Sequence, residues 1–320
     1  FNFEPGLRTG WDPFIARAVP AVMALPTNAT AIGHYRVIQP FNELEREGWI
    51  QGRIDYSASG LLELEREKPD VIIFQGRYSP EHLKDMAQFK RFSSARRIYE
   101  LDDYIIAPPK KNDHARNLPG NMRELVSAAI GLCDRVVVST EPLADALSSL
   151  HGDIRVVPNM LAASLWTGLV SARQRSAKPR VGWAGGTSHR GDLELLEGVV
   201  KAMAEDVDWV FFGMCPPQLR PYVKEFYEGI PFNRYPTMLA SLNLDLALAP
   251  LEQNLFNDCK SNLRLLEYGA CGFPVICSDI LCYRGDFPVT RVRNRAQDWI
   301  AAIREHLAEP DASAKAGEAL

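Results

Sequence analysis

Residues 258–279 read DCKSNLRLLEYGACGFPVICSD, and this stretch decides the fold class. Polar and cationic residues lead into a short amphipathic segment, a Gly-Phe-Pro turn stops it, and the apolar run Val275-Ile276-Cys277 follows. The pattern predicts a helix and then a buried strand, the repeating unit of an α/β protein. Similar units elsewhere in the chain predict parallel sheets covered by helices.

The start of this predicted helix concentrates charge. On a helix, Lys260, Arg264 and Glu267 follow one another at intervals of four and three residues, so they share a face. Ser261 is the expected N-cap, which leaves free N–H groups and the positive end of the helix dipole beside Lys260. The arrangement suits an anionic ligand such as phosphate. A solvated face with an ordinary Arg–Glu pair explains it equally well.

The composition is that of an ordinary globular protein with room for two domains. The chain has 320 residues, of which 46% are hydrophobic, and its formal net charge of -4 disfavours nucleic acid as a partner. Its six cysteines show no metal-site spacing, so reduced thiols in a cytoplasmic protein are expected. No apolar run is long enough to span a bilayer. Because the first residue is not Met, one expectation is that the chain is part of a longer multidomain protein.

Strand and helix patterns alternate along both halves of the chain. Short apolar runs predict strands at residues 18–24, 69–74, 97–101, 135–139, 154–158, 180–184, 208–212, 244–249 and 275–277. Longer periodic segments predict helices at residues 79–92, 123–132, 141–150, 193–204, 217–226, 237–243 and 296–307. The predicted organisation is a first domain over residues 1–160, a linker over 161–179, a second domain over 180–295, and a C-terminal helix and frayed tail over 296–320.

A glycine-rich loop follows the strand predicted at 180–184. Gly185, Gly186 and Thr187 are small residues that let backbone N–H groups approach an anion, and Arg190 adds a positive charge. The loop matches neither a P-loop nor a GxGxxG fingerprint, and a tight strand-to-helix turn explains its glycines about equally well. Because this loop and the charged helix both follow strands of the second half, they are expected at one edge of the sheet. There the cations could hold a nucleotide diphosphate.

Residues 245–279 resemble the donor-binding segment of GT-B glycosyltransferases of the glycosyltransferase family 4 type. The family pattern is a D-x-x-x-x-P-L strand followed by K-S-x-x-(K/R)-x-x-E-Y-x-A-x-G-x-P-V-I. The matching residues are Asp245, Pro250, Leu251, Lys260, Ser261, Arg264, Glu267, Tyr268, Ala270, Gly272, Pro274, Val275 and Ile276. Residues 180–196 also resemble the first strand and loop of the family's C-terminal domain, and the first half of the chain matches more loosely.

The resemblance implies two Rossmann-like α/β domains with parallel sheets facing across a cleft, the GT-B fold. It implies a retaining glycosyltransferase that moves a sugar from a nucleotide diphosphate sugar to a saccharide or lipid-linked acceptor, in surface polysaccharide or glycoconjugate synthesis. The implied donor-binding residues are Gly185, Gly186, Thr187, Arg190, Lys260, Ser261, Asn262, Arg264 and Glu267. Neither a metal nor another cofactor is expected, because cationic side chains take the diphosphate.

Catalytic and acceptor-side candidates depend on the same resemblance. The candidate catalytic residues are His34, Asp258, Lys260 and Arg190, and the acceptor-side candidates are Tyr35, Arg36, Asp102 and Asp103. A solvent-exposed loop explains residues 34–36 nearly as well. The chain departs from the family at Cys259, where the first Glu of a paired-Glu motif is expected, and Asp258 is the candidate replacement. Asp102-Asp103 could instead bind a metal as the DxD site of GT-A enzymes does, although a cap or turn is favoured.

A long loop in the first half is basic. It contains Lys110, Lys111, His114 and Arg116, with Arg123 just beyond it. A solvated loop is the favoured interpretation, and contact with an anionic lipid-linked acceptor or a membrane surface is the alternative. The expected location is cytoplasmic, with peripheral contact at the inner face of the membrane. Two other functions fit the same fold, a catalytically silent nucleotide-sugar or glycan-binding module and a sugar-nucleotide epimerase.

Overall fold

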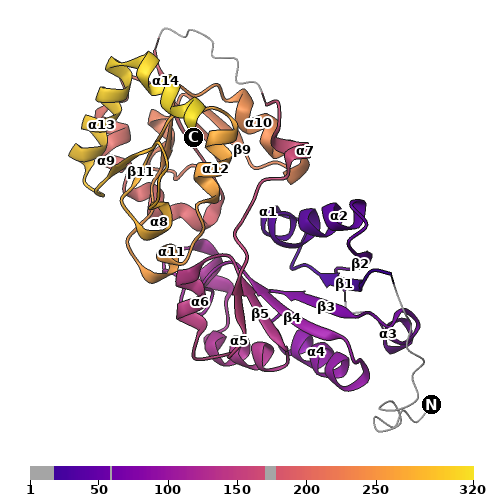
Figure 1. Ribbon diagram of the computed structural model, residues 1–320. Coiled ribbons are helices and arrows are strands. Elements are labelled where there is room, and N and C mark those ends of the chain that lie inside the picture. Colours follow the sequence, from indigo (N-terminus) through magenta and orange to yellow (C-terminus); the bar gives the residue numbers. More distant parts are fainter. Residues whose placement is uncertain (1–17, 58–59, 170–177) are drawn as a thin grey trace. The chain divides into compact units, whose positions relative to one another are not determined.

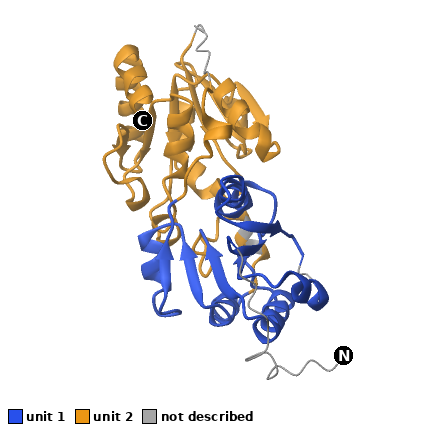
Figure 2. Ribbon diagram, turned by 45° about the vertical axis from the view of Figure 1, so that its right-hand side comes forward, with its two compact units in different colours: residues 1–102, 120–158 blue, residues 103–119, 159–320 orange. Residues whose placement is uncertain are grey.

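The computed structural model describes residues 18–57, 60–169 and 178–320 (Figure 1). Two compact units divide the chain. Unit 1 takes residues up to 102 together with 120–158, and unit 2 takes residues 103–119 together with 159–320 (Figure 2). Segment 103–119, which the sequence pattern places in the first half, is thus grouped with unit 2. The predicted linker over 161–179 also falls in unit 2, and its residues 170–177 lie outside the described residues.

Unit 1, in its described part, contains a six-stranded sheet in the order β2-β1-β3-β4-β5-β6, and all pairings are parallel. Its strands are β1 (Ala21–Leu25), β2 (Gln51–Ile54), β3 (Val71–Gln75), β4 (Arg96–Leu101), β5 (Arg135–Val138) and β6 (Ile154–Val156). Its α-helices are α1 (Ala31–Gly33), α2 (Gln39–Arg46), α3 (Leu61–Glu67), α4 (Pro80–Phe92), α5 (Met122–Gly131) and α6 (Glu141–Leu147). Strand β2 has no predicted counterpart, because its residues QGRI are mostly polar.

Unit 2 contains a second six-stranded parallel sheet among its described residues, in the order β12-β11-β10-β7-β8-β9. Its strands are β7 (Arg180–Ala184), β8 (Asp208–Gly213), β9 (Glu225–Glu228), β10 (Leu246–Ala249), β11 (Val275–Ser278) and β12 (Thr290–Val292). Its α-helices are α7 (Ala163–Trp166), α8 (Arg190–Glu194), α9 (Glu197–Ala202), α10 (Tyr235–Ser241), α11 (Leu255–Asp258), α12 (Leu263–Ala270), α13 (Ala296–Ala308) and α14 (Pro310–Ala319). The predicted α/β class with two parallel sheets is confirmed.

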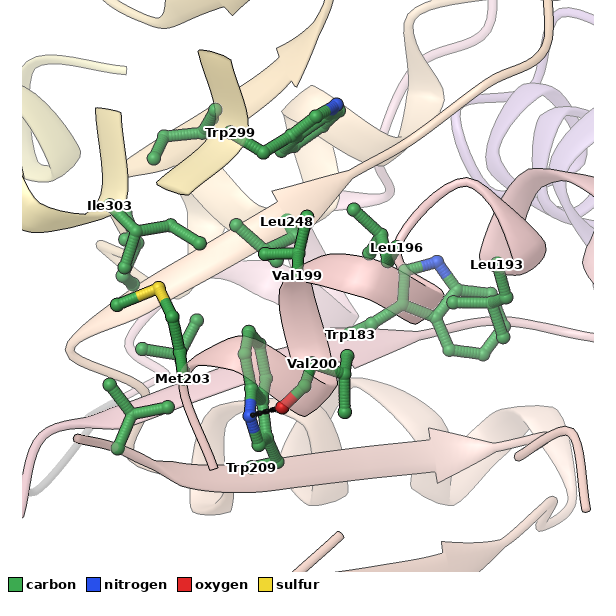
Figure 3. Packing of buried hydrophobic residues seen from close by; sticks show 14 of the residues in the cluster. Trp183, Leu193, Leu196, Val199, Val200, Met203, Trp209, Leu248, Trp299 and Ile303 are labelled. Carbon is green, nitrogen blue, oxygen red and sulfur yellow. Dashed lines mark hydrogen bonds between the residues drawn. The ribbon is translucent and has the colours of Figure 1, made fainter. Parts of the chain in front are cut away.

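The core of unit 2 fixes the strand from which the glycine-rich loop departs. Trp183 of β7 and Trp209 of β8 are buried with side chains of α8, α9 and α13, as Figure 3 shows. The Trp209 indole Nε1 donates to the Val200 carbonyl at 3.1 Å, which satisfies its polar atom inside the core. Residues that follow β7 therefore start from a rigid, fully packed element.

Residues 217–226 are not the predicted helix. They contain a 3-10 turn, Arg220–Tyr222, and the start of β9, in which Glu225 pairs in parallel with Val210 of β8. Pro221 lacks the N–H that a helix interior needs, and the open edge of β8 supplies backbone partners. Pairing with β8 therefore decides the structure of these residues, although their local pattern predicts a helix.

The chain end is a helix rather than the predicted frayed tail. Helix α14 begins with Pro310 at its first turn and packs against α12 and α13 (Figure 1). A Cβ atom on Gly317 would lie only 2.5 Å from the Gly272 carbonyl oxygen, so α14 approaches the turn after α12 closely. The composition of residues 310–320 is polar, and their order comes from this tertiary contact.

Two sequence-level expectations concern membrane spans and thiols. Among the helices of the described residues, none is long and apolar enough to cross a bilayer. All six cysteines are within the described residues, and none of them forms a disulfide bond.

Candidate functional site

The strand order of unit 2 creates a topological switch point. From β7 the chain continues to β8 on one side, and from β10 it continues to β11 on the other, while β7 and β10 are paired neighbours. Doubly wound sheets bind ligands at the carboxyl edge beside such a point. The glycine-rich loop follows β7, and the segment that leads into α12 follows β10. The predicted meeting of these two segments at one sheet edge is confirmed.

Arg264 of α12 lies directly against the glycine-rich loop. A Cβ atom on Gly185 would approach Arg264 Nη2 to 3.0 Å and Trp183 Cζ2 to 2.5 Å, so only glycine fits between them. The Arg264 guanidinium carbon also lies 5.8 Å from the centre of the Trp183 ring. Gly186 has open space where a side chain would begin. The Gly185 N–H already donates to the Phe212 carbonyl at 2.9 Å, so Gly186 is the glycine that leaves open backbone in this loop for an oxyanion.

One nitrogen of Arg264 lacks a hydrogen-bond acceptor among the described residues. Nη1 is buried without a partner, whereas Nε lies 3.6 Å from Glu267 Oε2. A buried donor without an acceptor costs free energy, and anionic oxygens are the acceptors that guanidinium groups bind most strongly. Arg264 is therefore positioned to take a ligand anion at the switch point.

Glu267 is held in place by aromatic residues. It is buried, and Tyr235 Oη donates to its Oε2 at 3.0 Å. Tyr235 stacks on Phe212 with ring centres 5.5 Å apart and meets Trp166 edge-on at 6.1 Å. Because these rings fix Tyr235, the carboxylate of Glu267 has a defined position beside Arg264, as the helical spacing predicts.

The other two predicted phosphate-binding cations are paired with carboxylates of segment 103–119. Lys260 Nζ lies 3.2 Å from Asp103 Oδ1 and 4.6 Å from the centre of the Phe256 ring. Arg190 donates to Asp113 from Nη2 at 2.9 Å and from Nε at 3.1 Å. The acceptor-side role predicted for Asp103 remains a prediction. Its placement beside Lys260, within unit 2, is a finding that the sequence pattern does not predict.

A histidine–aspartate pair lies at the start of α8. His189 Nδ1 is 2.8 Å from Asp192 Oδ2, and Asp192 Oδ1 accepts from Asn257 Nδ2 at 3.0 Å. Burial lowers the pKa of His189, and the positive charges of Lys260 and Arg264 lower it further, against the effect of Asp192. Burial is the largest cause of the low pKa, and the two cations add to it, so His189 is the neutral member of this cluster.

Helix α12 begins later than predicted. Its N-cap is Asn262, which makes no side-chain cap bond, so the predicted cap at Ser261 is wrong. Ser261 Oγ accepts from Asn159 Nδ2 at 2.7 Å and from the Leu263 N–H at 3.4 Å. The hydroxyl is engaged by a residue more than a hundred positions away in the chain, a contact that no local rule supplies. Thr187, the remaining predicted donor-site residue, is exposed.

The position of the missing family glutamate is occupied by a core residue. Cys259 is fully buried, with 0% of its surface exposed, so its thiol does not reach a ligand. Asp258, at the end of α11, is partly exposed and remains the polar candidate next to it. A buried packing residue therefore stands at the position where the resemblance implies a glutamate.

Residues 34–36 are helical rather than a loop. They begin a π-helix, His34–Ile38, in unit 1. Gly33 has a helical φ of -62°, and a Cβ atom on it would overlap the Asn28 carbonyl oxygen at 1.8 Å. The glycine therefore permits close backbone approach within a helix, and the alternative of a solvent-exposed loop at residues 34–36 is wrong. π-Helical turns occur often at functional sites, and His34 stays a candidate within unit 1.

Arg36 has a structural role in unit 1. Its Nε lies 2.6 Å from Glu100 Oε1, both side chains are buried, and its Nη1 donates to the Val157 carbonyl at 2.6 Å. Burial raises the pKa of Glu100, and the Arg36 charge opposes that rise. Tyr35 is buried as well. Acceptor-side roles for Tyr35 and Arg36 remain predictions.

The two adjacent aspartates belong to different units. The Asp102 carbonyl accepts from Ser139 Oγ at 3.0 Å in unit 1, whereas Asp103 pairs with Lys260 in unit 2. In the part of the chain that the structure describes, no group of three or more His, Cys, Asp or Glu residues is placed to hold a metal ion. The described residues therefore provide no set of metal ligands for the alternative DxD site.

Sequence reasoning missed several residues of this site. Trp183, which packs under Gly185 and Arg264, and Tyr235, which holds Glu267, carry no local signal because their partners are distant in the chain. Asp113 likewise pairs with Arg190 across 77 residues. Only His189 and Asp192 offered a usable pattern, since their spacing of three residues at a helix start places them on one face.

The class that these two sheets define is the GT-B fold, with two Rossmann-like domains. No family model matches the chain, and a search of curated proteins found no match. The fold assignment therefore rests on solved structures whose sequences are only distantly similar.

Three of these structures illustrate the range of proteins with this fold. HepE of Anabaena, solved in complex with UDP and glucose, has 13% identity and a TM-score of 0.60, over 94% of this chain and 93% of HepE. A putative UDP-N-acetylglucosamine 2-epimerase from Listeria monocytogenes has 12% identity and a TM-score of 0.58, over 95% of this chain and 92% of that one. TarM has 13% identity and a TM-score of 0.57 over 80% of this chain, which spans only 52% of TarM.

Proposed function

We propose that the chain is a glycosyltransferase that binds a nucleotide diphosphate sugar in unit 2. The observation that carries the proposal is Arg264, whose buried Nη1 finds no acceptor in the described part of the chain and whose guanidinium lies against Gly185 at the switch point. The GT-B fold supports it, as does the UDP in the HepE structure. The acceptor is a saccharide or a lipid-linked sugar, and the product belongs to surface polysaccharide or glycoconjugate synthesis.

The proposed roles follow from charge and position. Arg264, with Lys260 and Arg190, stabilises the negative charge that develops on the departing diphosphate, which is the main electrostatic demand of the reaction. Glu267 accepts hydrogen bonds from the ribose hydroxyls, because Tyr235 and its aromatic neighbours hold it beside Arg264. Asp258 contacts hydroxyls of the donor sugar. These side chains need no metal to hold the diphosphate.

Further parts of the proposal concern stereochemistry and surroundings. The reaction retains the anomeric configuration, and a donor phosphate oxygen accepts the proton of the acceptor hydroxyl. His34 of unit 1 contributes to catalysis. The enzyme acts at the cytoplasmic side of a membrane, where the basic residue Lys110 favours an anionic lipid-linked acceptor, since Lys111 is paired with Glu194 and Glu252.

Release of nucleoside diphosphate from a panel of nucleotide sugars tests the proposal. We expect turnover with one donor in the presence of acceptor glycans, and the same turnover after chelation of divalent metals. Donor binding without any turnover would contradict an enzymatic function. Loss of turnover on chelation would contradict the metal-independent mechanism.

Two specific observations favour other functions. The buried Cys259 in place of a glutamate favours a catalytically silent module that binds nucleotide sugar, for which the panel would give binding and no release. The similarity to a putative 2-epimerase favours epimerisation, for which a changed sugar would form without any acceptor. Analysis of the sugar product by NMR separates transfer from epimerisation.

A further inference from the structure

Segment 103–119 supplies negative charge to the cations of the proposed donor site. It runs between β4 and α5 in sequence, yet it belongs to unit 2, and its 3-10 turn Asp113–Asn117 packs against the turn Thr187–His189 of the glycine-rich loop. Two of its carboxylates, Asp103 and Asp113, contact Lys260 and Arg190. A single segment therefore reaches both cations.

The contacts imitate those of a phosphate. Arg190 Nη2 donates to Asp113 Oδ2 at 2.9 Å and Nε donates to Oδ1 at 3.1 Å, the forked arrangement in which guanidinium groups bind carboxylates and phosphates alike. Asp103 takes a single contact with Lys260 Nζ at 3.2 Å. A diphosphate and this pair of carboxylates present similar charged oxygens to the same two side chains.

These ion pairs are weak enough to exchange. The Asp113 and Arg190 side chains are 22% and 34% exposed, and that of Asp103 is 31% exposed. Lys260 is less exposed, at 16%, but one partner of each pair is about a third exposed, so solvent screens both pairs. A diphosphate carries more charge than one carboxylate and also gains the backbone of the glycine loop and Arg264, so it can displace them.

A third ion pair holds the segment without involving the proposed phosphate cations. Lys111 Nζ lies 2.7 Å from Glu194 Oε2 and 3.5 Å from Glu252 Oε1. In this ion pair the segment carries the positive charge and the rest of unit 2 carries the negative charge. An incoming phosphate therefore does not compete for the carboxylates that hold Lys111. Lys111 can therefore keep the segment close when its two aspartates are released.

We infer that segment 103–119 is an autoinhibitory strap whose Asp103 and Asp113 occupy Lys260 and Arg190 until a nucleoside diphosphate displaces them. Because the two cations are assigned through the proposed donor site, this inference rests on the proposed function. The strap adds one step to that function. A diphosphate that binds Lys260 and Arg190 replaces Asp103 and Asp113 there, so donor binding also releases the strap. Arg264, which the strap does not pair with, is the first contact for the diphosphate.

Isothermal titration with UDP, GDP, ADP and inorganic pyrophosphate tests the strap. We expect Asp113→Asn and Asp103→Asn to bind the preferred diphosphate about threefold to tenfold more tightly than the parent chain, because each removes one competing charge. Glu194→Gln is the matched control. It removes an equal charge close to Arg190 without touching either cation, and Lys111 keeps Glu252, so we expect a change below about twofold.

The alternative role of the aspartates predicts the opposite sign. If Asp103 and Asp113 instead orient the cations for the ligand, both Asn variants will bind the diphosphate more weakly, and the strap is refuted. An equal gain in Glu194→Gln would refute it too, since bulk charge would then explain the effect. Absence of binding to all four probes in the parent chain and both Asn variants would overturn the proposed donor site itself, along with the strap.

Hydrogen exchange gives an independent readout. We expect amide exchange in residues 103–119 to become faster when the diphosphate binds, because two attachments of the segment are lost, while the glycine-rich loop becomes slower. Slower exchange in both segments would show that the ligand tightens the strap, which contradicts displacement. Melting temperatures of the Asn variants within a few degrees of the parent chain confirm that the comparison is between folded proteins.

Discussion

Arg264 is the residue on which the donor site depends most. We expect Arg264→Ala to weaken nucleoside diphosphate binding by about 1.5–3 kcal/mol, the range for a charge-assisted hydrogen bond. We expect a smaller loss for Lys260→Ala. In the parent chain the diphosphate must displace Asp103 from Lys260, and this exchange offsets part of the contact that the variant loses. Titration calorimetry measures both. Arg304→Ala, which removes an exposed charge elsewhere in unit 2, is the matched control and should bind normally.

Tyr235 offers a test of the role of Glu267. We expect Tyr235→Phe to weaken UDP binding by about 0.5–1.5 kcal/mol, because Glu267 loses the hydrogen bond that orients it towards the ribose. Binding of inorganic pyrophosphate, which has no ribose, should not change. If the variant weakens both ligands equally, Tyr235 supports the diphosphate contacts and Glu267 does not select the ribose.

At the scale of elements, helix α14 is the part that sequence patterns missed most clearly. We expect Gly317→Ala to destabilise unit 2 by about 1–3 kcal/mol, because the new methyl group would press on the backbone of the turn after α12. Thermal unfolding measures the loss. Gly229→Ala is the control, since it has no atoms within 4 Å of the new Cβ and should leave the melting temperature unchanged or slightly higher.

The donor-side elements divide into those that local patterns predict and those that tertiary pairing creates. The helix α12, strand β11 and the loop after β7 follow from local charge, periodicity and glycine content. Strand β9 forms where a helix is expected, because Glu225 and its neighbours complete the edge of β8. Local periodicity fails wherever an open strand edge offers better backbone hydrogen bonding.

At the scale of the whole molecule, four partly buried histidines predict the response to acid. Burial lowers the pKa values of His34, His82, His189 and His306 in the folded chain. Below the unfolded value of about 6.5, the unfolded state takes up protons that the folded state does not. Stability is therefore complete above this pH and falls as the pH drops through it.

We accordingly expect a lower melting temperature at about pH 5.5 than at about pH 7.5, by about 2–4 °C for each kcal/mol lost. Calorimetry at constant ionic strength measures this shift, and NMR titration of the histidine rings assigns it. His306→Gln, which can keep a hydrogen bond to Thr290 or Ser313, should reduce the pH dependence. A melting temperature that is equal or higher at the lower pH would contradict the expectation.

The sequence by itself determined the α/β class, the alternation of strands and helices, and the approach of the glycine-rich loop to the charged helix. It could do so because hydrophobic period, helix spacing and glycine content are local properties. The sequence pattern identifies both Gly185 and Arg264 as candidate donor-binding residues, although it does not predict their direct contact. The fully buried Cys259 was visible only as a departure from the family pattern.

Only the tertiary structure decided what each charge faces. Asp113 reaches Arg190 and Asp103 reaches Lys260 because segment 103–119 packs in unit 2, although its neighbours in sequence belong to unit 1. Tyr235 reaches Glu267 through an aromatic stack that no spacing predicts. Ion pairing and burial depend on distances through space, and the order of residues along the chain fixes those distances only after the sheets have formed.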